Sequence, residues 1–526
     1  MDQNTHQHTV DLLARAIALH QNGDLPAAAA LYLEILAVAP DHFDALHLLG
    51  VYALQTGDLP AAYDLLERAV ALKPDDATAQ MHFAHALQRQ GLFERALRTY
   101  RHAVALAPND AMALTNYANL LLEMKRHPEA LPLLERAVQL APDYAEAYNN
   151  LGSALVDLRR FDEALVCIER ALELDPDYMV AHYNHGNALQ SLRRIDAALR
   201  SYDRALALAP GDVDANVNAG ICKLLSGALE QGWPQYEWRW RKPSYQTRMS
   251  AFEQPWWRGE TALRDTTLLL HAEQGYGDTL QLCRYAALLA EQGARVLLRV
   301  QPALKTLLAG LPGVQQVLSE ADPLPAFELH CPLMSLPLAM RTSLATIPSG
   351  AAYVHADPAR VEDWGRRLGP ATRPRIGLAW SGNANHDNDR QRSIPLAQLR
   401  ALLTADADFF SLQKDPRAVD RIVLANDERL HDHAAHLTDF ADTAALLAHM
   451  DLVISVDTSV AHLAGAMGKP VWILLPFVPD WRWLLERDDS PWYPSARLFR
   501  QSRDGNWDGA LADLARALAD NLLAAR

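Results

Sequence analysis

The chain has 526 residues, of which 50% are hydrophobic and 21% are charged, a balance typical of a folded protein with several domains. Its net charge of −15 argues against a general nucleic-acid-binding function. The sequence contains no apolar run of about 18 residues, and its first residues lack the basic and apolar regions of a signal peptide, so we expect a cytoplasmic protein without a membrane span. The cysteines are scattered without Cys-x-x-Cys pairs, which predicts reduced, buried thiols.

The N-terminal half is repetitive. Prolines recur 34 residues apart, at Pro40, Pro74, Pro108, Pro142, Pro176 and Pro210. Small residues recur in two further series with the same spacing, which are Ala16, Gly50, Ala84, Ala118, Gly152 and Gly186, and Ala28, Ala62, Ala96, Ala130, Ala164 and Ala198. A period of this size indicates stacked helix pairs that cross at the small residues. Residues 145–178 resemble a tetratricopeptide repeat throughout, so we predict an all-α tetratricopeptide solenoid over 9–240, with six full repeats and a degenerate seventh.

Four asparagines occupy one position of successive repeats and should form a ladder along the solenoid: Asn116, Asn150, Asn184 and Asn218. An amide side chain can donate to and accept from one peptide unit at once, so such a row could hold a polypeptide backbone. The alternative is an ordinary solvated polar face. The row resembles the asparagine ladder of the O-linked N-acetylglucosamine transferases, and this resemblance implies a protein acceptor bound to the repeats.

A junction rich in tryptophan, residues 241–264, follows the array. Tryptophans crowd into the junction and the repeat before it, at Trp233, Trp238, Trp240, Trp256 and Trp257. Large aromatic side chains can seal the last repeat of a solenoid against the next domain, and we favour this structural role. Stacking on a sugar ring is the alternative.

The C-terminal half alternates apolar strands with helices. Strands are predicted at 267–271, 294–300, 314–318, 327–331, 375–380, 409–413, 452–456 and 471–475, and longer helices at 279–292 and 358–368. The order predicts two doubly wound Rossmann-like domains, over 265–357 and 358–526. Two such domains suggest the glycosyltransferase B fold, and this likeness implies that the first is the acceptor-side domain and the second the nucleotide-sugar-binding domain. The glycine loop at 273–278 lacks a dinucleotide fingerprint.

Residues 451–476 form one strand–helix–strand unit. The helix should begin at residues 457–459, which are three good N-cap residues, and should end at Gly468. Ligands of doubly wound domains bind where helix N-termini meet the carboxyl ends of strands, and the N–H groups there suit a phosphate. The alternative is that Asp457 merely caps the helix.

Residues 267–519 resemble the lipopolysaccharide heptosyltransferases, glycosyltransferase family nine. Gly277-Asp278 at the first helix and the run from Asp457 to His462 carry this resemblance. The fusion with tetratricopeptide repeats is similar to bacterial flagellin glycosyltransferases. The resemblance implies transfer of a sugar to a protein, with flagellin the most plausible acceptor.

The acceptor side of the predicted site lies in the glycine loop. The resemblance implies that Asp278 is the catalytic base, whereas its position alone equally fits a helix cap. Gly275 and Gly277 would let the backbone approach the substrate, and Glu273 could bind a hydroxyl group.

The donor side is predicted from the second domain. Ser381 and Asn383 end its first strand, and either Arg392 or Arg390 in the next loop could clamp a phosphate. Lys414 is a further candidate. Asp457, Thr458, Ser459 and His462 would complete the phosphate end.

A metal site is not expected. The cluster of His431, His433 and His436 lacks a strand or helix signal that would fix ligand geometry, and no Asp-x-Asp motif ends a strand. We therefore expect an inverting, metal-independent glycosyltransferase that uses no cofactor. Two alternatives stay open: transfer to a lipid-linked or saccharide acceptor, with the repeats serving assembly, and a non-catalytic scaffold.

Overall fold

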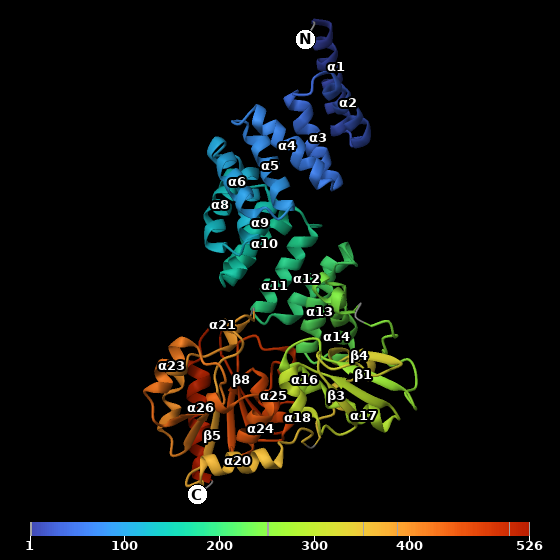
Figure 1. Cartoon of the computed structure of the whole chain (residues 1–526). Coiled ribbons are helices and arrows are strands. Elements are labelled where there is room, and N and C mark those ends of the chain that lie inside the picture. Colours follow the sequence, from blue (N-terminus) through green and yellow to red (C-terminus); the bar gives the residue numbers. More distant parts are fainter. Residues whose placement is uncertain (1–2, 250–251, 351, 387, 504, 525–526) are drawn as a thin grey trace. The chain divides into compact units, whose positions relative to one another are not determined.

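A computed structural model describes residues 3–249, 252–350, 352–386, 388–503 and 505–524 (Figure 1). The chain divides into two compact units, Met1–Ser191 and Leu192–Arg526, each with its own core. The boundary falls inside the repeat array, so the last repeats belong to the same unit as the α/β half. None of the helices within the described ranges is both long and apolar enough to cross a membrane.

The first unit consists of helix pairs. Its helices are α1 (Gln3–Gln21), α2 (Leu25–Val38), α3 (Phe43–Thr56), α4 (Leu59–Leu72), α5 (Ala77–Arg89), α6 (Phe93–Leu106), α7 (Ala111–Glu123), α8 (His127–Leu140), α9 (Ala145–Asp157), α10 (Phe161–Leu174) and α11 (Met179–Ser191). The small residues lie where two helices cross. A Cβ on Gly50 would lie 2.6 Å from Leu66 Cγ, and one on Gly152 would lie 2.3 Å from Ile168 Cγ1. The prediction of a helical solenoid is confirmed.

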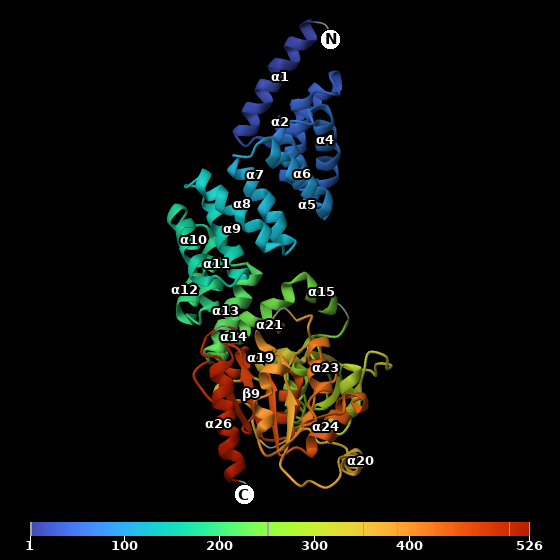
Figure 2. The same cartoon turned by 90° about the vertical axis from the view of Figure 1, so that its left-hand side faces the viewer.

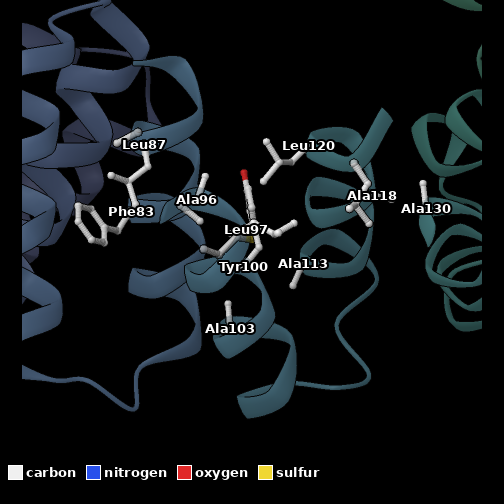
Figure 3. Close-up of a cluster of buried hydrophobic side chains, with 14 of the residues drawn as sticks. Phe83, Leu87, Ala96, Leu97, Tyr100, Ala103, Ala113, Ala118, Leu120 and Ala130 are labelled. Atoms are coloured by element: carbon white, nitrogen blue, oxygen red, sulfur yellow. The ribbon is translucent and has the colours of Figure 1, made fainter. Parts of the chain in front are cut away.

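The largest buried cluster of the first unit extends through several successive repeats. Leu97 and Tyr100 of α6 are buried beside Leu120 of α7, and Phe83 of α5 lies in the same cluster (Figure 3). A single helix pair could not bury these side chains, so the repeats stabilise one another.

The second unit begins with the end of the repeat array. Its helices here are α12 (Ile195–Leu208), α13 (Val213–Leu225), α14 (Leu229–Tyr236), a 3₁₀ turn η1 (Glu237–Arg241) and α15 (Pro243–Met249). The second helix of the seventh repeat is thus cut to eight residues and continues as a tighter turn.

The first sheet is parallel and has the strand order β3-β2-β1-β4. The strands are β1 (Thr267–His271), β2 (Arg295–Arg299), β3 (Val314–Leu318) and β4 (Leu329–Pro332). The helix predicted at 279–292 is wrong as one piece, because α16 (Tyr276–Leu282) ends before α17 (Tyr285–Glu291) begins. Side chains hold the carbonyl groups at the break: Tyr353 donates to Leu280 O at 2.8 Å and Arg284 to Gln281 O at 2.7 Å.

Further helices lead from this sheet to the next: α18 (Pro302–Leu308), η2 (Leu333–Ser335), α19 (Leu336–Ala339), η3 (Leu344–Thr346) and α20 (Pro358–Leu368). The second sheet is also parallel, with the order β10-β9-β8-β5-β6-β7. Its strands are β5 (Arg375–Ala379), β6 (Asp408–Ser411), β7 (Leu430–Asp432), β8 (Leu452–Val456), β9 (Val471–Leu475) and β10 (Ala496–Arg500). The edge strands β7 and β10 were not predicted.

The helices of the second sheet are α21 (Asp389–Arg392), α22 (Leu396–Leu399), η4 (Leu402–Thr404), α23 (Ala418–Ala425), η5 (Ala434–His436), α24 (Phe440–Ala448), α25 (Ser459–Ala466), η6 (Trp481–Trp483) and α26 (Asp508–Ala524). The last helix packs against β10 and is seen in red in Figure 2. The predicted order of a helical solenoid followed by α/β domains with parallel sheets is confirmed.

Candidate active site

Asp278 lies in the first turn of α16, just after the loop that follows β1. Its Oδ2 accepts a hydrogen bond of 2.7 Å from the Gly275 N–H, so the carboxylate does cap the helix. Its Oδ1 forms an ion pair with the Arg482 guanidinium of the second α/β domain. Both oxygens of the predicted base therefore have partners in this structure.

Arg482 is a site residue that the sequence did not predict. It lies in η6, in the loop after β9, and only 7% of its side chain is exposed. Its Nη1 is 2.8 Å from Asp480 Oδ1, and its Nε donates to Gln281 Oε1. Burial lowers the pKa of this guanidinium, but Asp480 and Asp278 more than compensate and hold the pKa above its usual value. An arginine this deeply buried between two carboxylates is a fixed positive charge.

Asp457 directly follows β8 and precedes α25 by two residues. Burial and the nearby Asp480 carboxylate raise the pKa of Asp457 to about 6, although Arg392 and Arg482 oppose this shift. Helix α25 begins at Ser459 as predicted, but the side chain of its N-cap residue Thr458 makes no capping bond. The Thr458 hydroxyl instead lies 3.2 Å from Ser455 Oγ.

His462 is buried at the contact between α25 and α16. Its Nδ1 lies 2.9 Å from the Tyr493 hydroxyl, and its ring stacks on Trp483 at 5.4 Å between centroids. Burial, followed by the charge of Arg482, lowers the pKa of His462 well below its usual value. The imidazole is therefore neutral at physiological pH and can offer a hydrogen bond but no positive charge.

Gly277 makes room for this histidine. A Cβ there would lie 2.6 Å from His462 Cδ2. The absence of a side chain thus lets α16 pack closely on α25, a role distinct from the predicted approach of backbone to substrate.

Arg392 joins the loop after β5 to the end of β8. Its Nη1 donates to the Asp457 carbonyl at 3.1 Å, and a Cβ on Gly382 would lie 2.8 Å from its Nη2. Its Nε is buried without a hydrogen-bond partner among the described residues, as is the hydroxyl of Ser381. Polar atoms left in this state are the ones that a ligand or water would satisfy.

Three predicted residues have other partners. Glu273 pairs with Arg239 of η1 at 2.8 Å, and burial raises the pKa of Glu273 to about 7 against the effect of that arginine. Asn383 is exposed and accepts a bond from the Asn385 N–H at 3.0 Å. Lys414 donates to the Thr438 carbonyl at 2.9 Å. None of these contacts joins the Asp278–Arg482 pair.

The junction tryptophans pack within the second unit. Trp233 donates to the Thr342 carbonyl at 2.8 Å and meets Trp481 edge-on at 5.1 Å between ring centroids. Trp240 packs on Trp256 at 5.5 Å, and Trp257 is 4% exposed. Trp233, Trp240 and Trp257 are buried and seal the end of the array, whereas Trp238 and Trp256 are partly exposed.

Part of the asparagine row in the first unit forms a chain of hydrogen bonds. Asn150 donates to Asn119 at 2.7 Å and accepts from Asn149 at 3.1 Å. Asn184 donates to Asn149 Oδ1 at 2.9 Å. The buried Asn149, which was not predicted, thus links two members of the row. Asn116 on α7 and Asn218 on α13 are partly exposed.

Among the described residues, no group of three or more His, Cys, Asp and Glu side chains could hold a metal ion. His431 lies on the short strand β7. A strand therefore does fix part of this histidine cluster, although the sequence showed no strand signal there. Its ring packs on Phe410 at 5.0 Å between centroids.

Comparison with known families gives two kinds of match. Tetratricopeptide repeat models match residues 75–143 and 109–177 in one case and 13–77, 149–213 and 183–232 in another. The model of glycosyltransferase family 9 (heptosyltransferase) matches residues 420–474, a stretch that contains Asp457 and His462 but not Asp278. Tetratricopeptide repeats thus precede a segment that is similar to glycosyltransferase family 9 in this chain.

Among curated proteins, the chain is 27% identical over 324 residues to Protein FlbA of Caulobacter vibrioides. The match covers 56% of this chain and 53% of the relative, so it spans about half the length of that protein.

Each of the following solved structures aligns with less than half of this chain. PilF of Pseudomonas aeruginosa is 23% identical, with a TM-score of 0.35, over 40% of this chain and 97% of that one. TTC0263 of Thermus thermophilus is 26% identical, with a TM-score of 0.32, over 35% of this chain and 99% of that one. A chain of the Cut9–Hcn1 complex is 16% identical, with a TM-score of 0.41, over 45% of this chain and 48% of that one.

Proposed function

We propose that this chain, in which tetratricopeptide repeats precede a glycosyltransferase family 9 segment, is an inverting, metal-independent glycosyltransferase. It would transfer a sugar from a nucleotide-sugar donor to a protein acceptor engaged by the repeats in the cytoplasm. Flagellin is the first acceptor to test. The observation that carries the proposal is the ion pair between Asp278 of the first α/β domain and Arg482 of the second. His462 lies against the neighbouring Gly277, and its Nε2 is 3.9 Å from Asp457 Oδ1.

In this proposal, two groups of the site would serve inverting transfer. The acceptor hydroxyl oxygen would form a bond to the anomeric carbon while the bond from that carbon to the donor phosphate oxygen breaks. Asp278 would take the hydroxyl proton, and the nucleotide would leave with the bonding electron pair. No covalent enzyme intermediate is needed, so the configuration at the anomeric carbon is inverted.

Positive charge for the leaving phosphate would come from Arg392. Its guanidinium already lies against the Asp457 carbonyl, and its buried Nε has no partner among the described residues. The N–H groups of Ser459 and its neighbours at the start of α25 and the Thr458 hydroxyl would add hydrogen bonds. Neutral His462 would serve as a hydrogen-bonding group there, and no step requires a metal ion or a cofactor.

The experiment begins with a thermal-shift screen of UDP-, GDP-, ADP- and CMP-sugars against the full chain, because a ligand of the folded state raises its melting temperature. The donor found is then incubated with purified flagellin, and the mass of the acceptor is measured. We expect Asp278→Asn to lower kcat by at least about 100-fold, the usual contribution of a general base, and EDTA to leave the rate unchanged.

Asp203→Asn is the matched control, because Asp203 is an exposed carboxylate on α12. Near-normal turnover by Asp278→Asn would mean that Asp278 only caps the helix and is not the base. Loss of activity in EDTA that a divalent ion restores would reject the metal-independent mechanism. Transfer to a saccharide but not to protein would favour the alternative acceptor class, with the repeats serving assembly.

A further inference from the structure

We propose that Arg482 is exchanged between the predicted base and the donor phosphate, so that Asp278 becomes a competent base only after the donor has bound. This inference rests on the proposed function and adds a residue and an order of binding to it.

Arg482 connects the two α/β domains through one side chain. Asp278 lies on α16 of the first domain, whereas Arg482 and Asp480 lie in the loop after β9 of the second. The guanidinium pairs with both carboxylates at once. The Asp278 side chain is 19% exposed and that of Arg482 is 7% exposed, so solvent screens their attraction only weakly.

The same guanidinium is close to the expected phosphate position. The next residue, Trp483, stacks on His462 of α25. Arg482 and Arg392 both favour the charged form of Asp457, which lies just before that helix. The arginine thus lies between the predicted base and the predicted phosphate end.

Pairing with Arg482 occupies the oxygen of Asp278 that the helix cap does not use. Its Oδ2 accepts from the Gly275 N–H and its Oδ1 is bound to the guanidinium, so an acceptor hydroxyl finds no carboxylate oxygen without a partner. A donor phosphate is a more highly charged partner that arginine binds through two parallel hydrogen bonds. When Arg482 turns to the phosphate, Oδ1 of Asp278 is released and can accept the proton of the acceptor hydroxyl.

Asp480 explains how the arginine can change partners without becoming an unpaired buried charge. Its carboxylate lies 2.8 Å from Nη1, and its Oδ1 also accepts a hydrogen bond of 3.0 Å from the Arg482 N–H. Asp480 therefore holds the guanidinium in both states, and only the contact with Asp278 is exchanged.

The exchange makes a prediction that a purely structural ion pair does not. If Asp278 competes with the phosphate for Arg482, removal of its charge should strengthen nucleotide binding. We expect Asp278→Asn to bind the product nucleotide about tenfold more tightly than the wild type, although it cannot catalyse transfer. Arg482→Lys, which keeps a positive charge but loses bidentate binding, should bind the nucleotide at least about tenfold more weakly.

The test measures Kd by calorimetry for UDP, GDP, ADP and CMP with the wild type, Asp278→Asn, Arg482→Lys, the double variant and the Asp203→Asn control. In the double variant, the gain caused by Asp278→Asn should disappear, because the two residues act on the same phosphate. Melting temperatures without ligand show whether each variant is folded.

Unchanged or weaker nucleotide binding by a folded Asp278→Asn variant would overturn the exchange. Independent, additive effects in the double variant would also overturn it. Both results are compatible with the proposed function, provided that the wild type transfers sugar. If none of the four nucleotides binds the wild type, the proposed function and this inference are both wrong.

Discussion

Individual residues of the candidate site are held in ionisation states that cost folding stability. Asp457 is the clearest case, because its side chain is 12% exposed and its pKa is raised from 3.8 to about 6. A raised carboxyl pKa means that the folded state binds the proton more tightly than the unfolded state. The free energy of unfolding therefore falls as pH rises from about 4 to about 6, and the full cost is present above pH 6.

Replacement of this carboxylate by a neutral amide should stabilise the protein at high pH. We expect Asp457→Asn to be more stable than the wild type by about 2–3 kcal/mol at pH 8, because a shift of about two pKa units corresponds to that free energy. At pH 5 the gain should shrink to about half. Melting temperatures at the two pH values measure the difference, with the exposed Asp415→Asn as control. A gain that does not depend on pH would contradict the proposed cause.

The residues predicted from local sequence and the residue that was missed differ in one respect. Asp278 and His462 belong to short local motifs, and a motif can be read in a single stretch of chain. Arg482 acquires its role from Asp278, which is 204 residues away in sequence. Such a pair leaves no local sequence pattern, and only the run Asp480-Trp-Arg-Trp483, with two charged residues and two tryptophans, could have drawn attention to this loop.

At the scale of elements, the shortened seventh repeat anchors the loop between β1 and α16, which precedes Asp278. Arg239 of η1 pairs with Glu273 at 2.8 Å and with Glu237 at 2.5 Å, and its side chain is 3% exposed. It also donates to Ser335 of η2 at 3.0 Å. The end of the repeat array and the first α/β domain therefore share one buried polar network.

Removal of Arg239 should destabilise the second unit and displace the Asp278 loop. We expect Arg239→Met to cost about 3 kcal/mol, since it leaves buried carboxylates without their cation. The added change Glu273→Gln should recover part of this loss, because it removes one of these charges. Melting temperature and kcat measure the two effects.

The control for that experiment is Arg241→Met, an exposed arginine two residues further on, which lies over the Trp238 ring at 3.7 Å. It should cost no more than about 1 kcal/mol. Equal losses in the two variants would mean that the buried network does not position the loop.

Elements with a regular sequence pattern were predicted well. Elements whose bounds depend on contacts with distant parts of the chain were not. The 34-residue spacing located the helix pairs, and apolar runs located the central strands. The edge strands β7 and β10 are short or charged, and their pairing partners lie elsewhere in the chain. The break between α16 and α17 depends on Tyr353, which is 73 residues beyond the carbonyl group that it satisfies.

At the scale of the whole molecule, the proposal requires the repeats to capture the acceptor while the α/β half binds the donor. The two activities should then be separable by mutation. The amides of Asn150 and Asn184 already make hydrogen bonds within the row, so a bound peptide would exchange these bonds rather than add new ones. Each exchange should contribute less than the usual 0.5–1.5 kcal/mol or so of a net hydrogen bond.

The test is the fourfold variant in which Asn116, Asn150, Asn184 and Asn218 are replaced by Ala. We expect flagellin binding to weaken by about 1–3 kcal/mol, which corresponds to roughly 5- to 150-fold in Kd. The Kd for the nucleotide should not change, because the predicted donor residues lie in the α/β domains. Asn109→Ala is the control, since Asn109 is an exposed asparagine that accepts a bond from Arg136. Unchanged flagellin binding by the fourfold variant, together with normal nucleotide affinity, would move acceptor recognition away from this row and leave the repeats an assembly role.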